Sequence, residues 1–241
     1  MDEFAMKKGH RDDATVIVDL ERVKIMDILE YRDQEKRIEY FKNRGTAWCE
    51  GIEVFCSDMW QGFLNTAQAV FPNATLVVDR FHFFGYRNKA LDNERKSLRR
   101  KFKDQEDFKR LKWALLKNAE DLTDDQKKKL ARAFLLAPPR KLLDEHKEKF
   151  RSIFDQRLTR EQGEIELNQW IEQAKKMKNK HLNNFLSMLN AWKDYVLNDF
   201  THRFTTSVIE GINNAIKTVK RMGYGFRNFV NFKQRILISF A

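Results

Sequence analysis

The sequence predicts an α/β fold in which strands and flanking helices are followed by a long all-helical segment and then by terminal helices. Short apolar runs rich in β-branched residues alternate with helical patterns in residues 1–84. Charged helical patterns without a strand signal fill residues 85–200, and helical patterns return in residues 201–241. We therefore expect an α/β part over residues 1–84, an all-helical part over residues 85–200 and terminal helices over residues 201–241.

Five strands are expected in the first part. Residues 14–20 and 22–28 are close enough to pair as a hairpin, and residues 2–6 are their expected neighbour. Residues 51–57 alternate apolar and polar side chains, and residues 74–79 form a further buried strand. Helices are expected between these strands, over residues 34–48 and 60–70.

The middle part is expected to be helical throughout. Its helices should break at Leu122-Thr123, at residues 137–139, which contain two prolines, and near Leu158-Thr159. The final helical pattern of this part has a clear apolar stripe. Its members are Leu182, Phe185, Leu186, Leu189, Trp192 and Val196.

Composition points to a polyanionic partner. The formal net charge is +11 and the isoelectric point is near 9.6, and Lys and Arg gain affinity for nucleic acid by releasing condensed counterions. No apolar run of about 18 residues and no signal peptide is visible, so we expect a protein that does not enter a membrane. Cys49 and Cys56 lack zinc-ligand spacing, and the five histidines are scattered. Any metal is therefore expected to be hard and oxygen-bound.

The most informative stretch is residues 207–226. If Ser207 caps a helix, then Glu210, Asn214, Lys217 and Arg221 recur every three to four residues and lie on one face. One carboxylate at the head of a row of cations suits a protein that holds a metal ion against a nucleic-acid backbone. Gly223 and Gly225 are expected to end this helix.

The stretch resembles the C-terminal motif of bacterial DDE transposases of the ISL-three family, in which Glu-Gly-x-Asn leads to Lys, Arg and Gly-[Tyr/Phe]-Gly-Phe. Two further parts of the chain resemble the same family: residues 2–10, and Ser57-Asp-Met-Trp60 followed by Val78-Asp-Arg-Phe-His82. The resemblance implies a ribonuclease-H-like mixed sheet with a helical insertion before the last acid. It thus implies a catalytic core in two pieces, residues 1–84 and 201–241, separated by a helical insertion over residues 85–200. These ordered matches extend over nearly the whole chain.

The resemblance also implies a site and an activity. Asp2, Asp58 and Glu210 would be the catalytic acids and the ligands of two Mg²⁺ ions, for which Mn²⁺ may substitute. The expected activity is DNA strand cleavage and strand transfer at insertion-sequence ends. The expected partners are double-stranded DNA, as element ends and target, and further copies of the chain in a homodimer or higher assembly on DNA. The expected place is the bacterial cytoplasm, at the nucleoid when acting.

Each acid also has a structural interpretation. Glu210 could be half of a capping box with Ser207, which does not exclude catalysis. Asp58 could cap the helix that begins near Trp60. Asp2, close to a chain terminus, could simply be solvated.

Further residues are candidates for supporting roles. Asp79, His82 and Asn214 are expected near the acids or a DNA end, although Asp79 and His82 could equally end a strand and cap or pack. Arg80 and Arg87 are candidate DNA contacts. The best candidates for phosphate contacts, against the alternative of a solvated helix face, are Lys217, Lys220, Arg221 and Arg227.

The chain begins one residue before Asp2, and it has neither the cysteine-rich segment nor the helix-turn-helix usual in the family. We therefore expect an N-terminally truncated catalytic domain. Two other functions stay open: a catalytically incompetent fragment that only binds DNA or a full-length transposase, and a ribonuclease-H-like nuclease that acts on RNA or on junctions.

Overall fold

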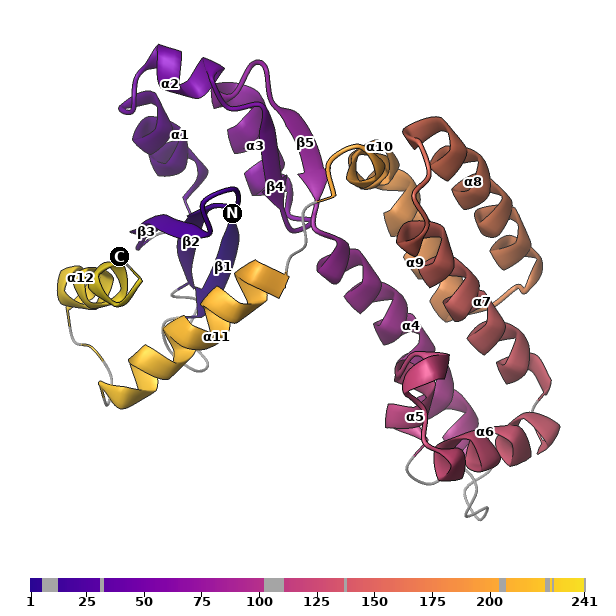
Figure 1. The fold of residues 1–241 in the computed structure, drawn as a ribbon. Coiled ribbons are helices and arrows are strands. Elements are labelled where there is room, and N and C mark those ends of the chain that lie inside the picture. Colours follow the sequence, from indigo (N-terminus) through magenta and orange to yellow (C-terminus); the bar gives the residue numbers. More distant parts are fainter. Residues whose placement is uncertain are drawn as a thin grey trace. The chain divides into compact units, whose positions relative to one another are not determined.

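The computed structural model describes residues 1–5, 13–30, 33–101, 111–136, 138–203, 207–223, 226 and 228–240. The chain divides into two compact units (Figure 1). Unit 1 consists of Met1–Arg80 together with His202–Ala241, and unit 2 is Phe81–Thr201. Unit 1 is a mixed α/β structure, whereas unit 2 is helical in its described residues. The α/β class predicted from the sequence is thus present, with small sheets and flanking helices.

Unit 1 contains an antiparallel sheet of three strands. Its order is β1 (Asp2–Ala5), β2 (Asp13–Asp19) and β3 (Lys24–Leu29). Asp2 lies opposite Val16 in the register of β1 and β2. The strands agree with the predicted runs. Thr15, Val16 and Ile17, three β-branched residues of β2, are buried, so both faces of this strand are covered.

A parallel pair of strands forms a second sheet in unit 1. The pair consists of β4 (Val54–Ser57) and β5 (Thr75–Val78), joined through α3 (Gln61–Val70). The α-ammonium of Met1 donates a hydrogen bond to the carbonyl oxygen of Cys56 at 2.6 Å. The start of β1 therefore lies beside the end of β4, and the two sheets meet along this edge.

Helices cover both faces of the antiparallel sheet (Figure 1). On one face, α11 (Ser207–Met222) and α12 (Phe229–Ser239) supply Ile212, Ile216, Phe232 and Ile236 to a buried cluster. Beneath the other face lies a cluster of buried residues from β1 to α3, among them Met1, Phe41 and Phe63. Two apolar layers thus hold the sheet between them.

The predicted helix over residues 34–48 is two helices, α1 (Gln34–Lys42) and α2 (Thr46–Glu50). Asp33 starts α1, because its carboxylate accepts hydrogen bonds from the backbone N–H groups of Glu35 and Lys36. Gly45 separates the two helices with a φ of 95°, a conformation that a glycine adopts readily. This turn is the reason why one helical pattern gives two short helices.

Unit 2 contains seven described α-helices. They are α4 (Arg80–Lys101), which begins at the last residue of unit 1, and α5 (Lys112–Leu116), α6 (Asp124–Leu136), α7 (Pro138–Asp155), α8 (Arg160–Lys176), α9 (Lys180–Ala191) and α10 (Lys193–Leu197). The starts of α6, α7 and α8 agree with the three predicted breaks. Thr159 forms a capping box with Gln162 at the start of α8. Of the predicted apolar stripe near the end of the unit, Trp192 alone is not buried.

Aromatic side chains form the core of unit 2. Trp170 is 1% exposed and stacks on His146 with ring centroids 4.6 Å apart. The indole N–H of Trp170 donates to the carbonyl oxygen of His146 at 2.9 Å, which joins α8 to α7. Burial lowers the pKa of His146, so this imidazole stays neutral at neutral pH.

Three cationic side chains are buried in the described part of the same unit: Arg87, Arg95 and Lys147. Arg87 packs over the ring of Phe84 at 4.6 Å and donates to the carbonyl oxygen of Lys147 at 3.1 Å, and burial lowers its pKa to about 10. The ammonium of Lys147 pairs with Asp144 at 2.9 Å and Glu148 at 2.8 Å. The prediction that Arg87 touches DNA is therefore wrong, because its guanidinium serves the packing of α4 against α7.

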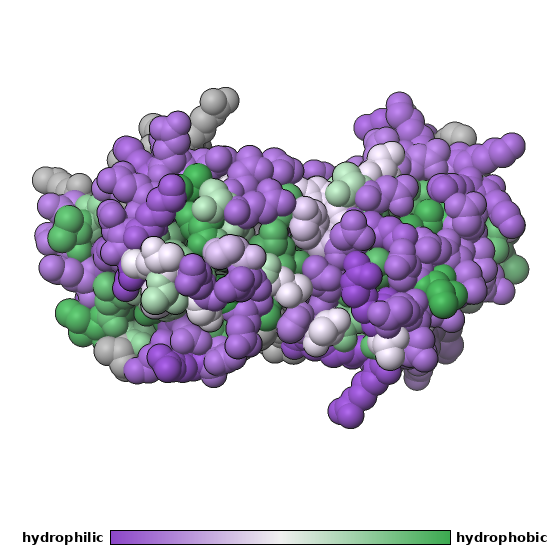
Figure 2. Space-filling view, turned by 90° about the horizontal axis from the view of Figure 1, so that it is seen from above, coloured by the Kyte–Doolittle hydropathy of each residue, from purple (hydrophilic) through white to green (hydrophobic). Residues whose placement is uncertain are grey.

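The surface shown in Figure 2 is mostly hydrophilic, with hydrophobic residues in scattered groups. Cys49 and Cys56 are both free thiols and buried. Within the described part of the chain, no helix is long and apolar enough to span a membrane.

Gly163 provides a test of the packing of unit 2. A Cβ at this position would overlap the ring of Phe200, so Gly163→Ala should lower the free energy of unfolding by about 1–3 kcal/mol. Gly85→Ala is the matched control: it lies in α4, where a Cβ meets nothing within 4 Å, and should be neutral or stabilise by about 0.5–1 kcal/mol. Urea unfolding measures both, and equal effects of the two changes would contradict the packing described.

Candidate active site

The alternation of side chains along β1 directs Asp2 toward α11. Asp2 and Phe4 share one face of the strand, and Phe4 packs with Ile212 and Ile216 of α11. The Oδ2 of Asp2 accepts a hydrogen bond from the amide of Asn213 at 2.5 Å, and its Oδ1 accepts one from the backbone N–H of Glu3 at 2.8 Å. Both carboxylate oxygens of this half-buried acid are therefore held.

Glu3 points to the opposite face of β1, where it meets Arg37 of α1. Arg37 is fully buried, and its guanidinium lies 3.8 Å from the carboxylate of Glu3. The same guanidinium lies over the ring of Trp60 at 4.4 Å. A buried cation needs such partners, since an uncompensated charge in the interior is costly. Arg37 thus ties β1 to the segment between β4 and α3.

Asp58 follows directly after β4 and is half-buried. It does not cap the next helix, because α3 begins at Gln61, its N-cap residue is Trp60, and that end has no side-chain cap. The capping interpretation of Asp58 is therefore wrong. The hydrogen bond between Met1 and Cys56 brings the backbone that leads to Asp2 next to the strand that leads to Asp58.

Glu210 lies in the first turn of α11, one turn before Asn213. Its side chain is outside the described part of the structure, as is that of Ser207, so the capping box between them stays a prediction. Residues three apart lie on neighbouring positions of a helix surface. The backbone therefore brings the start of α11, with Glu210, to the face of β1 that bears Asp2.

Asn213, which the sequence interpretation missed, takes the position expected for Asn214. Asn213 is 8% exposed and contacts Asp2, whereas Asn214 is exposed. Among the described residues, the Oδ1 of Asn213 has no hydrogen-bond partner. Asn213 lies three residues after Glu210, and Asn214 lies four residues after it. Both spacings fit the helix period, so the sequence alone does not show which of the two side chains turns inward.

The remaining predicted site residues are divided between the two units. Asp79 is buried at the end of β5, where its N–H donates to the carbonyl oxygen of Ser57 at 2.8 Å. His82 is half-buried in unit 2, with its ring beside that of Phe81. On α11, Lys217 and Arg221 are exposed and Lys220 is half-exposed. Arg227 lies outside the described residues.

The oxygen atoms at Asp2 are of the type that a hard cation prefers. Among the side chains that the structure describes, no three His, Cys, Asp or Glu residues gather into a metal site, and Glu210 is not among those side chains. The buried amide oxygen of Asn213 beside the carboxylate of Asp2 needs a donor or a cation. These two oxygen donors are therefore compatible with a hard divalent cation.

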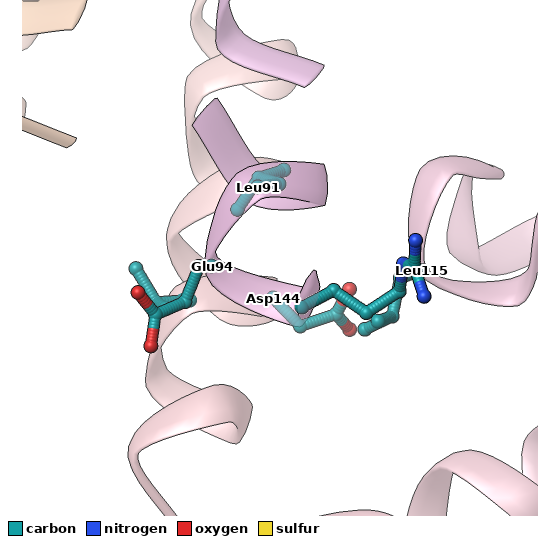
Figure 3. Close-up of a pocket in the computed structure, with 6 residues that line it drawn as sticks. Leu91, Glu94, Leu115 and Asp144 are labelled. Carbon is teal, nitrogen blue, oxygen red and sulfur yellow. The ribbon is translucent and has the colours of Figure 1, made fainter. Parts of the chain in front are cut away.

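A small cavity in unit 2 is too small to hold a substrate. Its volume is about 20 Å³, and Leu91, Glu94, Leu115 and Asp144 are among its lining residues (Figure 3). Space for about one water molecule excludes a nucleotide or any larger ligand from it. The side chains that meet around Asp2 are the better candidate for a site.

Comparisons with known proteins agree on one family. The family model described as "Transposase" matches residues 1–236. The chain is 29% identical to the transposase for insertion sequence element IS1001 of Bordetella parapertussis, over 100% of this chain and 60% of that protein. It is 25% identical to the transposase for insertion sequence element IS1557 of Mycobacterium tuberculosis, over 95% of this chain and 56% of that protein. The chain thus spans less than two thirds of these relatives, and no solved structure matches it.

Because Asn213 contacts Asp2 and Asn214 is exposed, a negative charge should destabilise the protein at position 213 but not at position 214. Asn213→Asp would place two carboxylates within hydrogen-bonding distance. We expect it to lower the free energy of unfolding by about 1–3 kcal/mol at pH 8. The loss should shrink as the pH falls through about 4–5, where one carboxyl regains a proton and can donate it.

Asn214→Asp is the control, because it adds the same charge at an exposed neighbouring position. Thermal unfolding at pH 4 and pH 8 measures both variants. An equal, pH-independent effect of the two changes would contradict the contact.

Proposed function

Because this chain belongs to the DDE transposases of the ISL-three family, we propose that it is a catalytic domain for metal-dependent DNA strand cleavage and strand transfer at insertion-sequence ends. One observation supports this most strongly. The hydrogen bond from Asn213 to Asp2 joins the first strand to α11, one turn from Glu210, although the two residues are 211 positions apart. Asp2 and Glu210, which were predicted from separate motifs, thus lie on two elements that contact each other, β1 and α11.

We propose that Asp2, Asp58 and Glu210 hold the metal ions. Two Mg²⁺ ions commonly activate the attacking hydroxyl and stabilise the leaving oxygen in phosphodiester chemistry. Asp2 is the first residue of β1, and Asp58 directly follows β4. The hydrogen bond between Met1 and Cys56 joins the start of β1 to the end of β4. In this arrangement, repulsion among the three carboxylates would be the electrostatic reason for a cation there.

The residues around the acids have a positioning role in this proposal. Asn213 fixes the rotamer of Asp2 and keeps its amide oxygen beside it. Arg37 and Glu3 anchor β1 from the opposite face, and the ring of Trp60 on Arg37 fixes the segment after Asp58. Prepositioned ligands reduce the reorganisation that catalysis would otherwise require.

DNA contacts are proposed for the exposed cations of α11. Lys217 and Arg221 are four residues apart on one helix face, in a chain with a net charge of +11. Such contacts position the backbone of the duplex without reading its sequence. Asn214 lies on the same exposed stripe, and Asp79 and His82 are proposed near a DNA end.

The finer fold and the assembly are proposals of the same kind. A three-stranded antiparallel sheet whose first strand adjoins a parallel pair supports a ribonuclease-H-like core with unit 2 as its insertion. Action on paired ends implies a homodimer or higher assembly, bound at the bacterial nucleoid.

The alternative of a fragment that only binds DNA has less support. A loosely held Asp2 would support that alternative. In the structure both oxygens of Asp2 are hydrogen-bonded, and β1 is in register with β2 from Asp2 onward. A held carboxylate favours the catalytic function.

A nicking assay tests the catalytic proposal. Glu210→Gln should lower Mg²⁺-dependent nicking and strand transfer on a plasmid with element ends by at least about 10³-fold, as loss of a catalytic group commonly does. Glu172→Gln is the control, because it removes an exposed acid on α8 that pairs only with Lys175 among the contacts described. DNA binding should persist in both variants. Binding without nicking in the unaltered chain would favour the binding fragment instead.

Salt dependence tests the DNA surface. Replacing Lys217 and Arg221 together by Ala should reduce the slope of log K against log [salt] by roughly 1.8, about 0.9 for each phosphate that the protein no longer neutralises. Lys127 and Lys128 of α6, both exposed, provide the matched double-Ala control with the same change in charge. Titrations by fluorescence anisotropy between about 50 and 200 mM salt, a range over which such slopes are commonly resolved, give both slopes. Equal slopes would assign the α11 cations to a solvated face.

A further inference from the structure

The side-chain amide of Asn213 is held in one orientation. Asn213 lies in the second turn of α11 and is 8% exposed, and its Nδ2 lies 2.5 Å from the Oδ2 of Asp2. An ionised carboxylate accepts hydrogen bonds and does not donate them, so the NH₂ end of the amide must face Asp2. The amide oxygen, Oδ1, therefore lies at the other end of the same planar group.

The Oδ1 of Asn213 is a buried acceptor that lacks a donor. Within the described ranges of the chain it has no hydrogen-bond partner. Buried oxygens of this type nearly always have one, because water solvates them well in the unfolded chain. Ile212 and Ile216 fill the apolar cluster beneath α11, and the bond to Asp2 uses only the amide nitrogen. Neither packing nor the bond to Asp2 therefore explains the oxygen.

The oxygen lies where a cation bound at Asp2 would meet it. Only the amide carbon separates Oδ1 from the nitrogen that contacts Asp2, so Oδ1 and the carboxylate are neighbours. Asn213 also follows Glu210 by one helical turn on α11, which runs beside β1 (Figure 1). Carboxylate and amide oxygens are both ligands that suit Mg²⁺ and Mn²⁺. A divalent cation would supply the positive charge that this acceptor lacks.

A neutral ligand suits the charge of the proposed site. Three carboxylates and two divalent cations together keep one positive charge, which matches the single negative charge of a phosphodiester. A fourth carboxylate would cancel that charge and would repel Asp2. The amide of Asn213 adds a ligand oxygen without a charge, and its N–H group holds Asp2 at the same time.

We propose that Asn213 is a fourth metal-binding residue, whose Oδ1 ligates the divalent ion held by Asp2 while its Nδ2 orients the Asp2 carboxylate. This inference rests on the proposed function, since it assigns a further ligand to the same ion. In this arrangement α11 supplies ligands from two successive turns, Glu210 and Asn213.

Binding of Mn²⁺ to the full chain without DNA tests the proposal, measured by isothermal titration calorimetry and by the electron paramagnetic resonance signal of the free ion. Asn213→Leu removes both the oxygen and the N–H group, and it should weaken binding by at least about tenfold. This loss alone would not distinguish a ligand from a positioning residue, because partners that only orient a ligand commonly change metal affinity by about 10–100-fold.

Asn213→Asp separates the two roles. It keeps an oxygen at the ligand position and loses only the N–H group, so it should bind Mn²⁺ at least as tightly as the unaltered chain. Asn214→Asp is the matched control, because it adds the same charge at an exposed position. It should change the affinity by less than about fivefold, as an exposed charge commonly does, and it should bind no more tightly than Asn213→Asp.

Thermal unfolding gives a second measurement for variants of lower stability. An ion that binds only the folded state raises the Tm. Mn²⁺ should therefore raise the Tm of Asn213→Asp by at least as much as that of the unaltered chain, and the Tm of Asn213→Leu by less.

Unchanged affinity in Asn213→Leu would overturn the proposal, as would the absence of Mn²⁺ binding by the unaltered chain. Equal weakening in Asn213→Leu and Asn213→Asp would overturn it too, because Asn213 would then only position Asp2. The nicking assay is a separate measurement. A chain that binds Mn²⁺ through Asn213 without cutting DNA would contradict the proposed function and keep this ligand. A chain that cuts DNA, and whose affinity for Mn²⁺ survives Asn213→Leu, would do the reverse.

Discussion

The strict alternation of side chains along β1 is the constraint on which the α/β unit depends. Asp2 and Phe4 face α11 and α12, while Met1 and Glu3 face α1 and α3. A shift of one residue in the pairing with β2 would exchange the two faces. It would bury the carboxylate of Asp2 against Arg37 and turn the acid away from α11. The candidate site and both apolar layers therefore share a single register, fixed by Asp2 opposite Val16.

The buried charge of Arg37 makes that register energetically decisive. A guanidinium with no exposed surface needs a carboxylate and aromatic faces around it, and Glu3, Trp60 and Phe63 provide them. Replacing either partner alone would leave the other buried without compensation, which is commonly worse than having no pair.

Much of the secondary structure could be predicted from the sequence, because strong local patterns determine it. The β-branched run of β2 and the breaks before α6 and α8 are examples. The division of the predicted helix at Gly45 needed a positive φ that no periodicity indicates. Asn213 was missed, and Arg87 was given the wrong role, for a different reason. Which side chain turns inward depends on how a helix packs, and helical spacing permits neighbouring choices.

The interruption of unit 1 by unit 2 has a consequence for biosynthesis. Phe81–Thr201 is one continuous stretch, so it can fold as soon as it leaves the ribosome. In the core of the α/β unit, Phe4 packs in one cluster with Ile212 and Phe232. The apolar faces of the first strands therefore stay uncovered until the last helices have been synthesised. Contacts of such long separation form slowly. Nascent chains should therefore expose the sheet to chaperones or to other strands until translation ends.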